Sequence, residues 1–476
     1  MFGRTAALLG LGLTLLALAV TATSTAAPGS TREETAIVSA DGAKLAATLT
    51  LPPGTTPAGG WPALVLMHGL GGTRAQGLAI AQAMGVGDRY AVLAFDARGH
   101  GASEGLVGLD GPNEIADVRA VFAWLRDRPD VSDTRIGAFG VSYGGGAAWN
   151  SLVAGVPWAA VATCITFTDL AGSLYPQQLA RTGVIAGFVS SLDQTRLDPA
   201  LTAARDAAFK GDTATVAAFS AARSSLAALK GVRTPVFVMH GRRDFAFGLD
   251  QALPAWSALA GPKKLWIGNI GHVTATSQGP DTPAMLAEGA RWFDRFLADP
   301  AGSPPAPSVT IAAEGTSRTV SSPALPATRQ EVASSAAAKT VTTSAGKAMW
   351  SFPATTKAVE VFGAPVVKTT VTATGGWSRV VAVLTAVNGR RSKVVSVGGV
   401  PVKPGTGTYA IRLISQATLI PRGWRLVLTL ASSTASAPAP VTPVYLDLAL
   451  PDTARLSVSS VAYTLPVLTQ PVSGGA

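Results

Sequence analysis

A serine stands between two glycines in the run Gly140-Val141-Ser142-Tyr143-Gly144. The pattern Gly-x-Ser-x-Gly is typical of the sharp turn between a strand and a helix that presents a nucleophilic serine. Because the turn is tight, we expect both glycines to be needed where side chains would meet neighbouring backbone. The helix that follows directs its N-terminal N–H groups toward developing negative charge. Ser142 is therefore the candidate nucleophile.

A serine hydroxyl is a weak nucleophile until a base removes its proton. The chain contains four candidates for this base, namely His68, His100, His240 and His272. His272 lies in a loop after the last predicted strand of the first region and before a helix, at the sheet edge where the serine is expected. We predict that His272 is the general base and that the other three histidines are structural.

The imidazole needs a carboxylate that holds its tautomer and stabilises the imidazolium. Asp244 follows the penultimate predicted strand and is our candidate. Asp250 is a rival six residues later, but it precedes a helical pattern and is typical of a helix N-cap. The order Ser142, Asp244, His272 is the one found in α/β-hydrolases.

A tetrahedral intermediate needs two hydrogen-bond donors for its oxyanion. The backbone N–H of Tyr143, directly after the serine, is one candidate. The other is the N–H of Leu70, in the loop that follows the strand ending at His68-Gly69.

Other chemistry is poorly supported. The chain has no phosphate-binding loop and no His, Cys, Asp or Glu cluster with metal-ligand spacing. Gly69, Gly71 and Gly72 do not have the spacing of a dinucleotide-binding turn. We therefore predict no cofactor, no metal and no nucleic-acid partner.

The elements that would position these residues occupy residues 31–299, where strand patterns alternate with helical ones. This alternation predicts a mostly parallel sheet covered by helices. We expect strands at residues 63–67, 91–95, 135–140, 236–239 and 264–267, and helices at 113–126 and 285–297. Residues 166–230 interrupt the rhythm with an Ala-rich, helix-prone insertion, which predicts a small helical cap over the site.

The remaining segments differ in composition. Residues 300–307 are rich in proline, which predicts a linker. Residues 308–476 consist of short β-rich runs separated by Gly, Pro and Ser, including 358–362, 369–374, 380–386, 425–430 and 445–450. We predict an all-β sandwich there.

The N-terminus has the three-part composition of an export signal. A basic start is followed by an uncharged apolar run and small residues, which predicts a signal peptide at residues 1–27 and a secreted protein. An uncleaved N-terminal anchor is the alternative. The only cysteine is Cys164, so no internal disulfide is possible.

The net charge is concentrated in the last third of the chain. From Ala306 onward there are 15 Lys and Arg but 5 Asp and Glu, and 15 − 5 equals the whole-chain net charge of +10. This excess suggests that the β domain docks on an anionic cell-envelope surface. A solubilising basic face is the alternative.

Several runs together resemble a known family. Residues 41–49, 96–105, 140–144 and 244–250 are similar to the X-prolyl dipeptidyl-peptidases and the cocaine-esterase-type acyl hydrolases. Residues 360–365, 420–426 and 450–456 resemble the C-terminal jelly-roll domain of that family. The resemblance implies an α/β-hydrolase fold followed by a jelly roll, and hydrolysis through an acyl-enzyme. It also implies Ser142 as nucleophile, Asp244 as acid and His272 as base.

The resemblance ranks release of an N-terminal X-Pro dipeptide first, with hydrolysis of carboxylic esters or action as an acylase as alternatives. A peptidase of this kind needs an anion for the substrate amino terminus, and the candidates are Glu104, Asp169, Asp193 and Asp198. A rival from another class is a cell-envelope-binding protein in which the α/β region is an inert scaffold.

Overall fold

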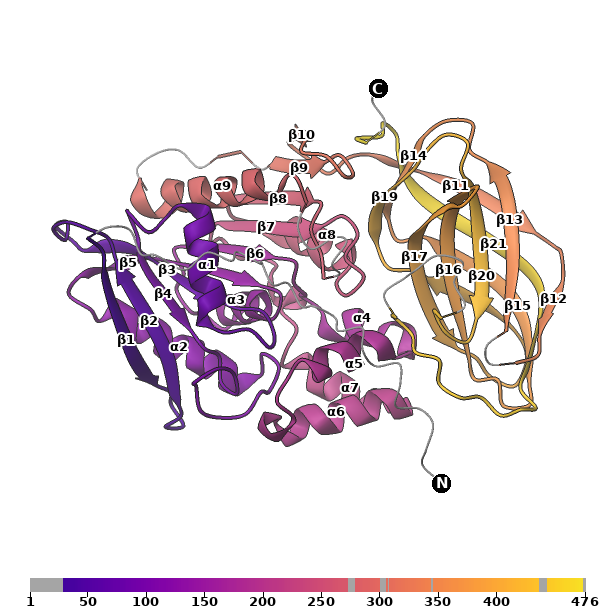
Figure 1. Ribbon diagram of the computed structural model, residues 1–476, viewed down its shortest axis with the longest axis horizontal. Coiled ribbons are helices and arrows are strands. Elements are labelled where there is room, and N and C mark those ends of the chain that lie inside the picture. Colours follow the sequence, from indigo (N-terminus) through magenta and orange to yellow (C-terminus); the bar gives the residue numbers. More distant parts are fainter. Residues whose placement is uncertain are drawn as a thin grey trace.

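The computed structural model describes residues 29–272, 279–299, 305–306, 308–343, 346–435 and 443–473. The predicted export signal, and most of the predicted linker at 300–307, lie outside them. Among the described residues, no helix is both long and apolar enough to cross a membrane. An α/β domain and a β-sandwich lie side by side, and a group of short helices lies beside both (Figure 1).

The α/β domain is built on one mixed sheet of ten strands, in the order β1-β2-β4-β3-β5-β6-β7-β8-β9-β10. The seven strands from β3 to β9 run parallel to one another, whereas the outer pairs β1–β2, β2–β4 and β9–β10 are antiparallel. Their carboxyl ends therefore meet at one edge, where side chains from distant segments can be brought together. The strands are β1 (Thr31–Val38), β2 (Lys44–Leu51), β3 (Trp61–Met67), β4 (Ala91–Phe95), β5 (Val131–Val141), β6 (Ala160–Cys164), β7 (Val236–Gly241), β8 (Lys263–Gly268), β9 (Ser308–Ala312) and β10 (Thr319–Ser322).

Helices cover both faces of this sheet, as the alternating pattern predicts. α1 (Arg74–Met84) and α9 (Thr282–Phe293), extended by a π turn at Asp294–Ala298, pack on one face. α2 (Pro112–Arg126), α3 (Tyr143–Val153) and α8 (Leu249–Ala258) pack on the other. Each helix turns an apolar stripe toward the strands, so the sheet is buried on both sides.

A helical insertion between β6 and β7 forms the cap. It lies at the carboxyl edge of the sheet and reaches across to the sandwich (Figure 1). Its members are α4 (Leu170–Leu174), η1 (Pro176–Gln178), α5 (Thr182–Ser190), η2 (Gln194–Arg196), α6 (Pro199–Lys210), α7 (Thr213–Ala221) and η3 (Leu226–Ala228).

The sequence-based boundary at residue 308 is wrong, because β9 and β10 belong to the α/β sheet. β9 continues the parallel ladder of β8, from Lys264 opposite Ser308 to Ile267 opposite Ile311. Val309 and Ile311 are buried in the core of the α/β domain. A short β-rich run suits either sheet equally well, and only the tertiary pairing selects one of them.

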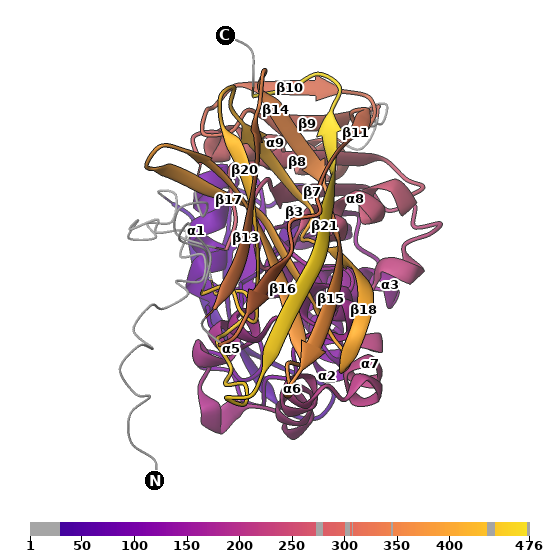
Figure 2. The same ribbon diagram turned by 90° about the vertical axis from the view of Figure 1, so that its right-hand side faces the viewer.

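The sandwich begins at β11 and consists of two antiparallel sheets that enclose their own apolar core. One sheet has the order β18-β15-β21-β14-β19, with β11 and β12 paired to β21, and the other has the order β13-β20-β16-β17. Figure 2 shows the sandwich in front of the α/β domain. Its strands are β11 (Thr328–Ser335), β12 (Lys339–Val341), β13 (Lys347–Ala354), β14 (Val359–Gly363), β15 (Val366–Thr374), β16 (Arg379–Asn388), β17 (Arg391–Pro401), β18 (Gly405–Arg412), β19 (Gln416–Ile420), β20 (Arg425–Ala431) and β21 (Arg455–Leu468).

The strand expected at residues 445–450 is absent, because this segment runs along the cap. The carbonyl oxygen of Val444 accepts a hydrogen bond from Gly183 N at 3.0 Å, and Leu446 N donates to Thr182 Oγ1 at 2.8 Å. Between these two contacts, Tyr445 N lies 3.3 Å from Thr434 Oγ1 and Tyr445 O accepts from Thr434 N at 3.1 Å. The backbone groups of residues 444–446 therefore bond α5 and Thr434 instead of a neighbouring strand.

Strand β16 explains how the two domains share apolar surface. Val380, Ala382 and Leu384 point into the sandwich core. The alternate residues Val381 and Val383 are equally buried but join a second cluster with cap and α/β residues. Because side chains alternate along a strand, this continuous apolar run serves two cores at once.

Candidate active site

The turn around Ser142 has the geometry that its sequence predicts. Ser142 joins β5 to α3 with φ 53° and ψ −117°, a backbone conformation that non-glycine residues seldom adopt. A Cβ on Gly140 would lie 2.0 Å from the Gly144 carbonyl oxygen, and one on Gly144 would lie 2.2 Å from that of Met67. Both glycines are therefore required by direct steric contact with backbone.

Substitution of Gly144 by alanine tests this requirement. We expect a loss of about 3 kcal/mol or more in the free energy of unfolding, because the new methyl group can be accommodated only by moving β3 or the turn. Urea unfolding measures the loss. Gly87→Ala is the matched control, since nothing lies within 4 Å of a Cβ at that position. Equal stability of the two variants would contradict the steric argument.

Ser142, His272 and Asp244 form one hydrogen-bonded chain. Ser142 Oγ lies 2.8 Å from His272 Nε2, and His272 Nδ1 lies 2.6 Å from Asp244 Oδ2. The carboxylate accepts from Nδ1–H, which leaves Nε2 free to accept the serine proton. The three side chains come from the ends of β5, β7 and β8, so the parallel sheet brings together residues that are 130 positions apart.

The acid is held ionised by the groups around it. Burial alone would raise the pKa of Asp244, but the adjacent His272 ring and backbone N–H groups lower it below its ordinary value. Asp244 Oδ1 accepts hydrogen bonds from Ala246 N at 2.9 Å and Phe247 N at 3.0 Å. His240 Nε2 lies 3.0 Å from the carbonyl oxygen of Phe247, which fixes the same loop.

The sandwich also contributes to the acid loop, which sequence reasoning missed. The side-chain amide of Gln416, in β19, donates a hydrogen bond to the Asp244 carbonyl oxygen at 2.8 Å. One residue later, Ala417 N donates to the carbonyl oxygen of Arg242 at 2.7 Å. No local signal could have identified Gln416, since it lies 172 residues from Asp244.

The other histidines and Asp250 lie outside this chain. His68 Nδ1 is 2.7 Å from Gly69 O, and its Nε2 accepts from Ala97 N. Burial lowers the pKa of His68 to about 4, so the ring is neutral. Asp250 lies in the first turn of α8, whose N-cap is Gly248, and burial raises its pKa. The expectation that Asp250 caps the helix is therefore wrong.

The loop after β3 lies next to the serine. A Cβ on Gly69 would be 3.6 Å from the Ser142 Cβ, and Gly69 N donates to the side-chain oxygen of Gln76 at 2.7 Å. Among the hydrogen bonds of the described residues, none uses the backbone N–H of Leu70 or of Tyr143. Both groups therefore meet the first requirement of an oxyanion hole, an N–H without an internal acceptor.

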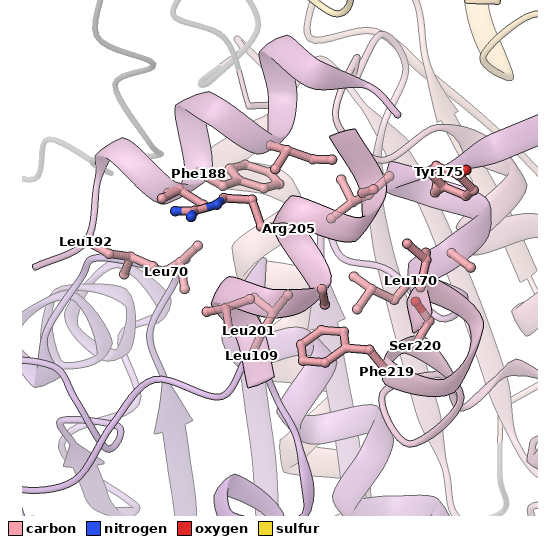
Figure 3. A pocket seen from close by; sticks show the side chains of 17 residues that line it. Leu70, Leu109, Leu170, Tyr175, Phe188, Leu192, Leu201, Arg205, Phe219 and Ser220 are labelled. Atoms are coloured by element: carbon pink, nitrogen blue, oxygen red, sulfur yellow. The ribbon is translucent and has the colours of Figure 1, made fainter. Parts of the chain in front are cut away.

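An apolar pocket, whose empty space of about 620 Å³ includes a part that is open to solvent, lies between the cap helices and this loop (Figure 3). Leu70 and Phe188 line it and connect it to the serine, since the Phe188 ring centroid lies 6.0 Å from that of His272. Of the described residues that line it, only Arg205 carries a charge. The pocket suits an uncharged, apolar group.

The four carboxylates considered for binding an amino terminus are occupied elsewhere. None of them lines the pocket. These carboxylates are Glu104, Asp169, Asp193 and Asp198. Each of the three aspartates accepts a hydrogen bond from a backbone N–H group at a helix N-terminus, and Glu104 accepts one from Lys44 N at 3.0 Å. Each is therefore explained as a local structural contact.

The described part of the chain contains no group of three or more His, Cys, Asp or Glu that could hold a metal ion. Cys164 is buried, and burial raises the pKa of its thiol to about 12. The thiol therefore stays protonated and unreactive at neutral pH.

The chain matches the model of the X-Pro dipeptidyl-peptidase (S15) family over residues 41–274. The α/β domain belongs to this family. The family consists of hydrolases, and the match covers Ser142, Asp244 and His272.

Solved structures share both domains of this S15 protein. A CocE/NonD family hydrolase from Staphylococcus aureus is 14% identical, with a TM-score of 0.68 over 92% of this chain and 94% of that one. An alpha-amino acid ester hydrolase is 15% identical, with a TM-score of 0.64 over 94% and 97%. An aminopeptidase from a Thaumarchaeota archaeon of marine sediment is 16% identical, with a TM-score of 0.64 over 93% and 97%. These likenesses show that the S15 domain and its sandwich form a recurring fold.

One curated relative is similar over a shorter stretch. The quorum-quenching protein AidA of Acinetobacter baumannii (strain MDR-ZJ06) is 36% identical over 110 residues, which is 23% of this chain. The match spans 36% of that relative's length.

Proposed function

We propose that this protein is a serine hydrolase that cleaves carboxylic esters through an acyl-enzyme on Ser142. The observation that supports this most directly is the hydrogen-bonded chain from Ser142 through His272 to Asp244, beside an apolar pocket. The N–H groups of Leu70 and Tyr143 are the proposed donors to the oxyanion. Each such donor contributes about 3 kcal/mol to lowering the barrier.

The reaction proceeds in two half-reactions. Ser142 Oγ attacks the ester carbonyl carbon while His272 Nε2 takes the hydroxyl proton, and the tetrahedral intermediate forms. It collapses as the C–O bond to the alcohol breaks, and His272 passes the proton to the leaving oxygen. Water then attacks the acyl-enzyme with the same base, which releases the carboxylic acid and restores the Ser142 hydroxyl.

The pocket favours esters over X-Pro peptides. A dipeptidyl-peptidase must bind a charged amino terminus, and burying an ammonium without an anion is costly. The pocket offers no carboxylate, and its single charge, Arg205, is positive. Release of X-Pro dipeptides is the second candidate, and the S15 family match favours it.

Labelling with a fluorophosphonate probe tests the nucleophile. We expect the purified protein to be labelled and Ser142→Ala to lose labelling entirely, because only an activated serine reacts. The matched control Ser257→Ala removes an exposed hydroxyl on α8 and should keep the label. Labelling that persists in Ser142→Ala would exclude Ser142.

The substrate class is tested by comparing p-nitrophenyl esters with Gly-Pro and Ala-Pro anilides on the same preparation. Ester turnover without anilide turnover supports the first proposal. Faster release from the anilides would show that the second candidate is correct.

A further inference from the structure

We propose that the apolar pocket of the cap holds the acyl chain of the substrate, and that helix α6 measures its length. This inference rests on the proposed function, because it names the acyl groups that Ser142 would accept. The substrate class is esters of unbranched, uncharged fatty acids of medium length, about eight carbons. The pocket's position, lining and length carry the argument.

The lining provides apolar contact along its whole length. Four cap helices contribute side chains to it, and nearly all of these are aliphatic or aromatic. The Arg205 guanidinium is bonded to its neighbour Asp206 at 2.8 Å, and the Arg205 side chain is 30% exposed. A charged or strongly polar acyl group would therefore be desolvated without compensation, whereas an alkyl chain would not.

The pocket runs from the active site toward the far side of the cap. Figure 3 shows Leu70 and Leu192 at one end and Tyr175 at the other. Leu70 and Leu192 share an apolar cluster with Tyr143, beside the serine, whereas Tyr175 shares another with Ala208 and residues of α7. A chain that starts at Ser142 would therefore enter past Leu70 and point toward Tyr175.

Helix α6 lies along this path, so the distance between its residues gives the length of the path. Leu201 belongs to the cluster at the entrance, Ala204 lies about one turn further, and Ala208 belongs to the cluster at the far end. The seven helical steps from Leu201 to Ala208 span about 10 Å, the length of about eight carbons in an extended alkyl chain. The small side chains of Ala204 and Ala208 keep this path open.

The pocket lies on the acyl side of the ester bond. The acyl carbonyl oxygen must reach the N–H of Leu70, and Leu70 lines the entrance. The alcohol oxygen must instead reach His272 Nε2 to receive its proton. His272 does not line the pocket, so the alcohol leaves on the other side.

A chain-length series of p-nitrophenyl esters, from acetyl to palmitoyl, tests the proposal. We expect kcat/KM to rise by up to about 4-fold for each buried methylene, to peak near octanoyl and then to fall. A parallel series of alkyl acetates, which varies the alcohol instead, should show no such peak. A steady decline from acetyl, or a peak only in the alcohol series, would overturn the assignment.

Two substitutions test whether the end of the pocket near Ala208 and Tyr175 limits the length of the acyl chain. Ala208→Leu should lower the octanoyl-to-acetyl ratio of kcat/KM by at least about 10-fold and move the optimum to shorter chains, because the three added heavy atoms block the path. Val216→Phe narrows the same end from α7 and should act in the same direction. Ala203→Leu is the matched control: it makes the same change on the exposed face of α6 and should leave the profile unchanged.

A binding readout keeps the test independent of turnover. Alkyl fluorophosphonates of increasing chain length should label Ser142 fastest near eight carbons, and Ala208→Leu should shorten this optimum. Equal effects of Ala208→Leu and Ala203→Leu on either chain-length profile would overturn the proposal that α6 sets the acyl-chain length. If acetyl ester is hydrolysed but chain length has no effect, only this inference fails. If no ester is hydrolysed and no probe reacts, the proposed function fails.

Discussion

Substitution of Asp244 by asparagine is expected to lower kcat by about four orders of magnitude without unfolding the protein. The carboxylate accepts from His272 Nδ1 at 2.6 Å, and it also accepts from two backbone N–H groups of its own loop. An amide in this place can turn its NH₂ group toward Nδ1. His272 would then carry its proton on Nε2, where it cannot accept the proton of Ser142.

Ester kinetics together with circular dichroism measure this effect. Asp250→Asn is the matched control, because it makes the same change at the rival carboxylate six residues later. Since burial raises the pKa of Asp250, and no hydrogen bond of the described residues joins it to His272, we expect kcat within about 3-fold of the parent. A comparable loss in both variants would remove Asp244 from its proposed role.

Breaking the ion pair between Arg242 and Glu360 is expected to have the largest effect on stability. Arg242 directly follows β7, two residues before Asp244, and Glu360 lies in β14 of the sandwich. The guanidinium bonds the carboxylate and the carbonyl oxygen of Ala312, and both side chains are fully buried. Ser473 N also donates to Glu360 at 2.8 Å.

Arg242→Met should lower the free energy of unfolding by about 3–5 kcal/mol, because it leaves the Glu360 carboxylate buried without its partner. The double variant Arg242→Met/Glu360→Leu should recover part of this loss, since no charge then remains buried. Urea unfolding of the single and double variants measures both effects.

Arg32→Met is the control, since it removes one member of an exposed pair with Glu34. Its cost should stay below about 1 kcal/mol. If Arg242→Met also cost less than about 1 kcal/mol of unfolding free energy, the proposed importance of the buried ion pair would be contradicted. Because Asp244 is two residues away, we also expect Arg242→Met to lower ester turnover more than Arg32→Met does.

Local patterns were sufficient for most strands of the α/β domain, although not for β6, β9 and β10, and for the identity of its candidate site. The Gly-x-Ser-x-Gly turn needs backbone contacts within a few residues and along one neighbouring strand, so its sequence specifies it directly. The parallel strands then bring their carboxyl ends to one edge, and this predicts that Ser142, Asp244 and His272 meet. Export and docking on an anionic surface stay predictions from sequence alone.

Tertiary pairing decided what no local pattern could. Residues 308–322 are β-prone, but they joined the α/β sheet because β8 offered an open edge. Residues 445–450 are β-prone too, yet Leu446 N bonds the cap and Tyr445 bonds Thr434, so the segment forms no strand. In both segments propensity specifies an extended chain, and the choice of partner depends on residues far away in the sequence.

The sequence by itself determined which residues are the candidate nucleophile, base and acid, because each lies just after a strand whose period and order are local properties. Only the tertiary structure decided how the acid loop is supported by Gln416 and how four cap helices enclose an apolar pocket. The physical reason is that support and enclosure depend on contacts between segments far apart in the chain. Such contacts leave no periodic trace in either segment.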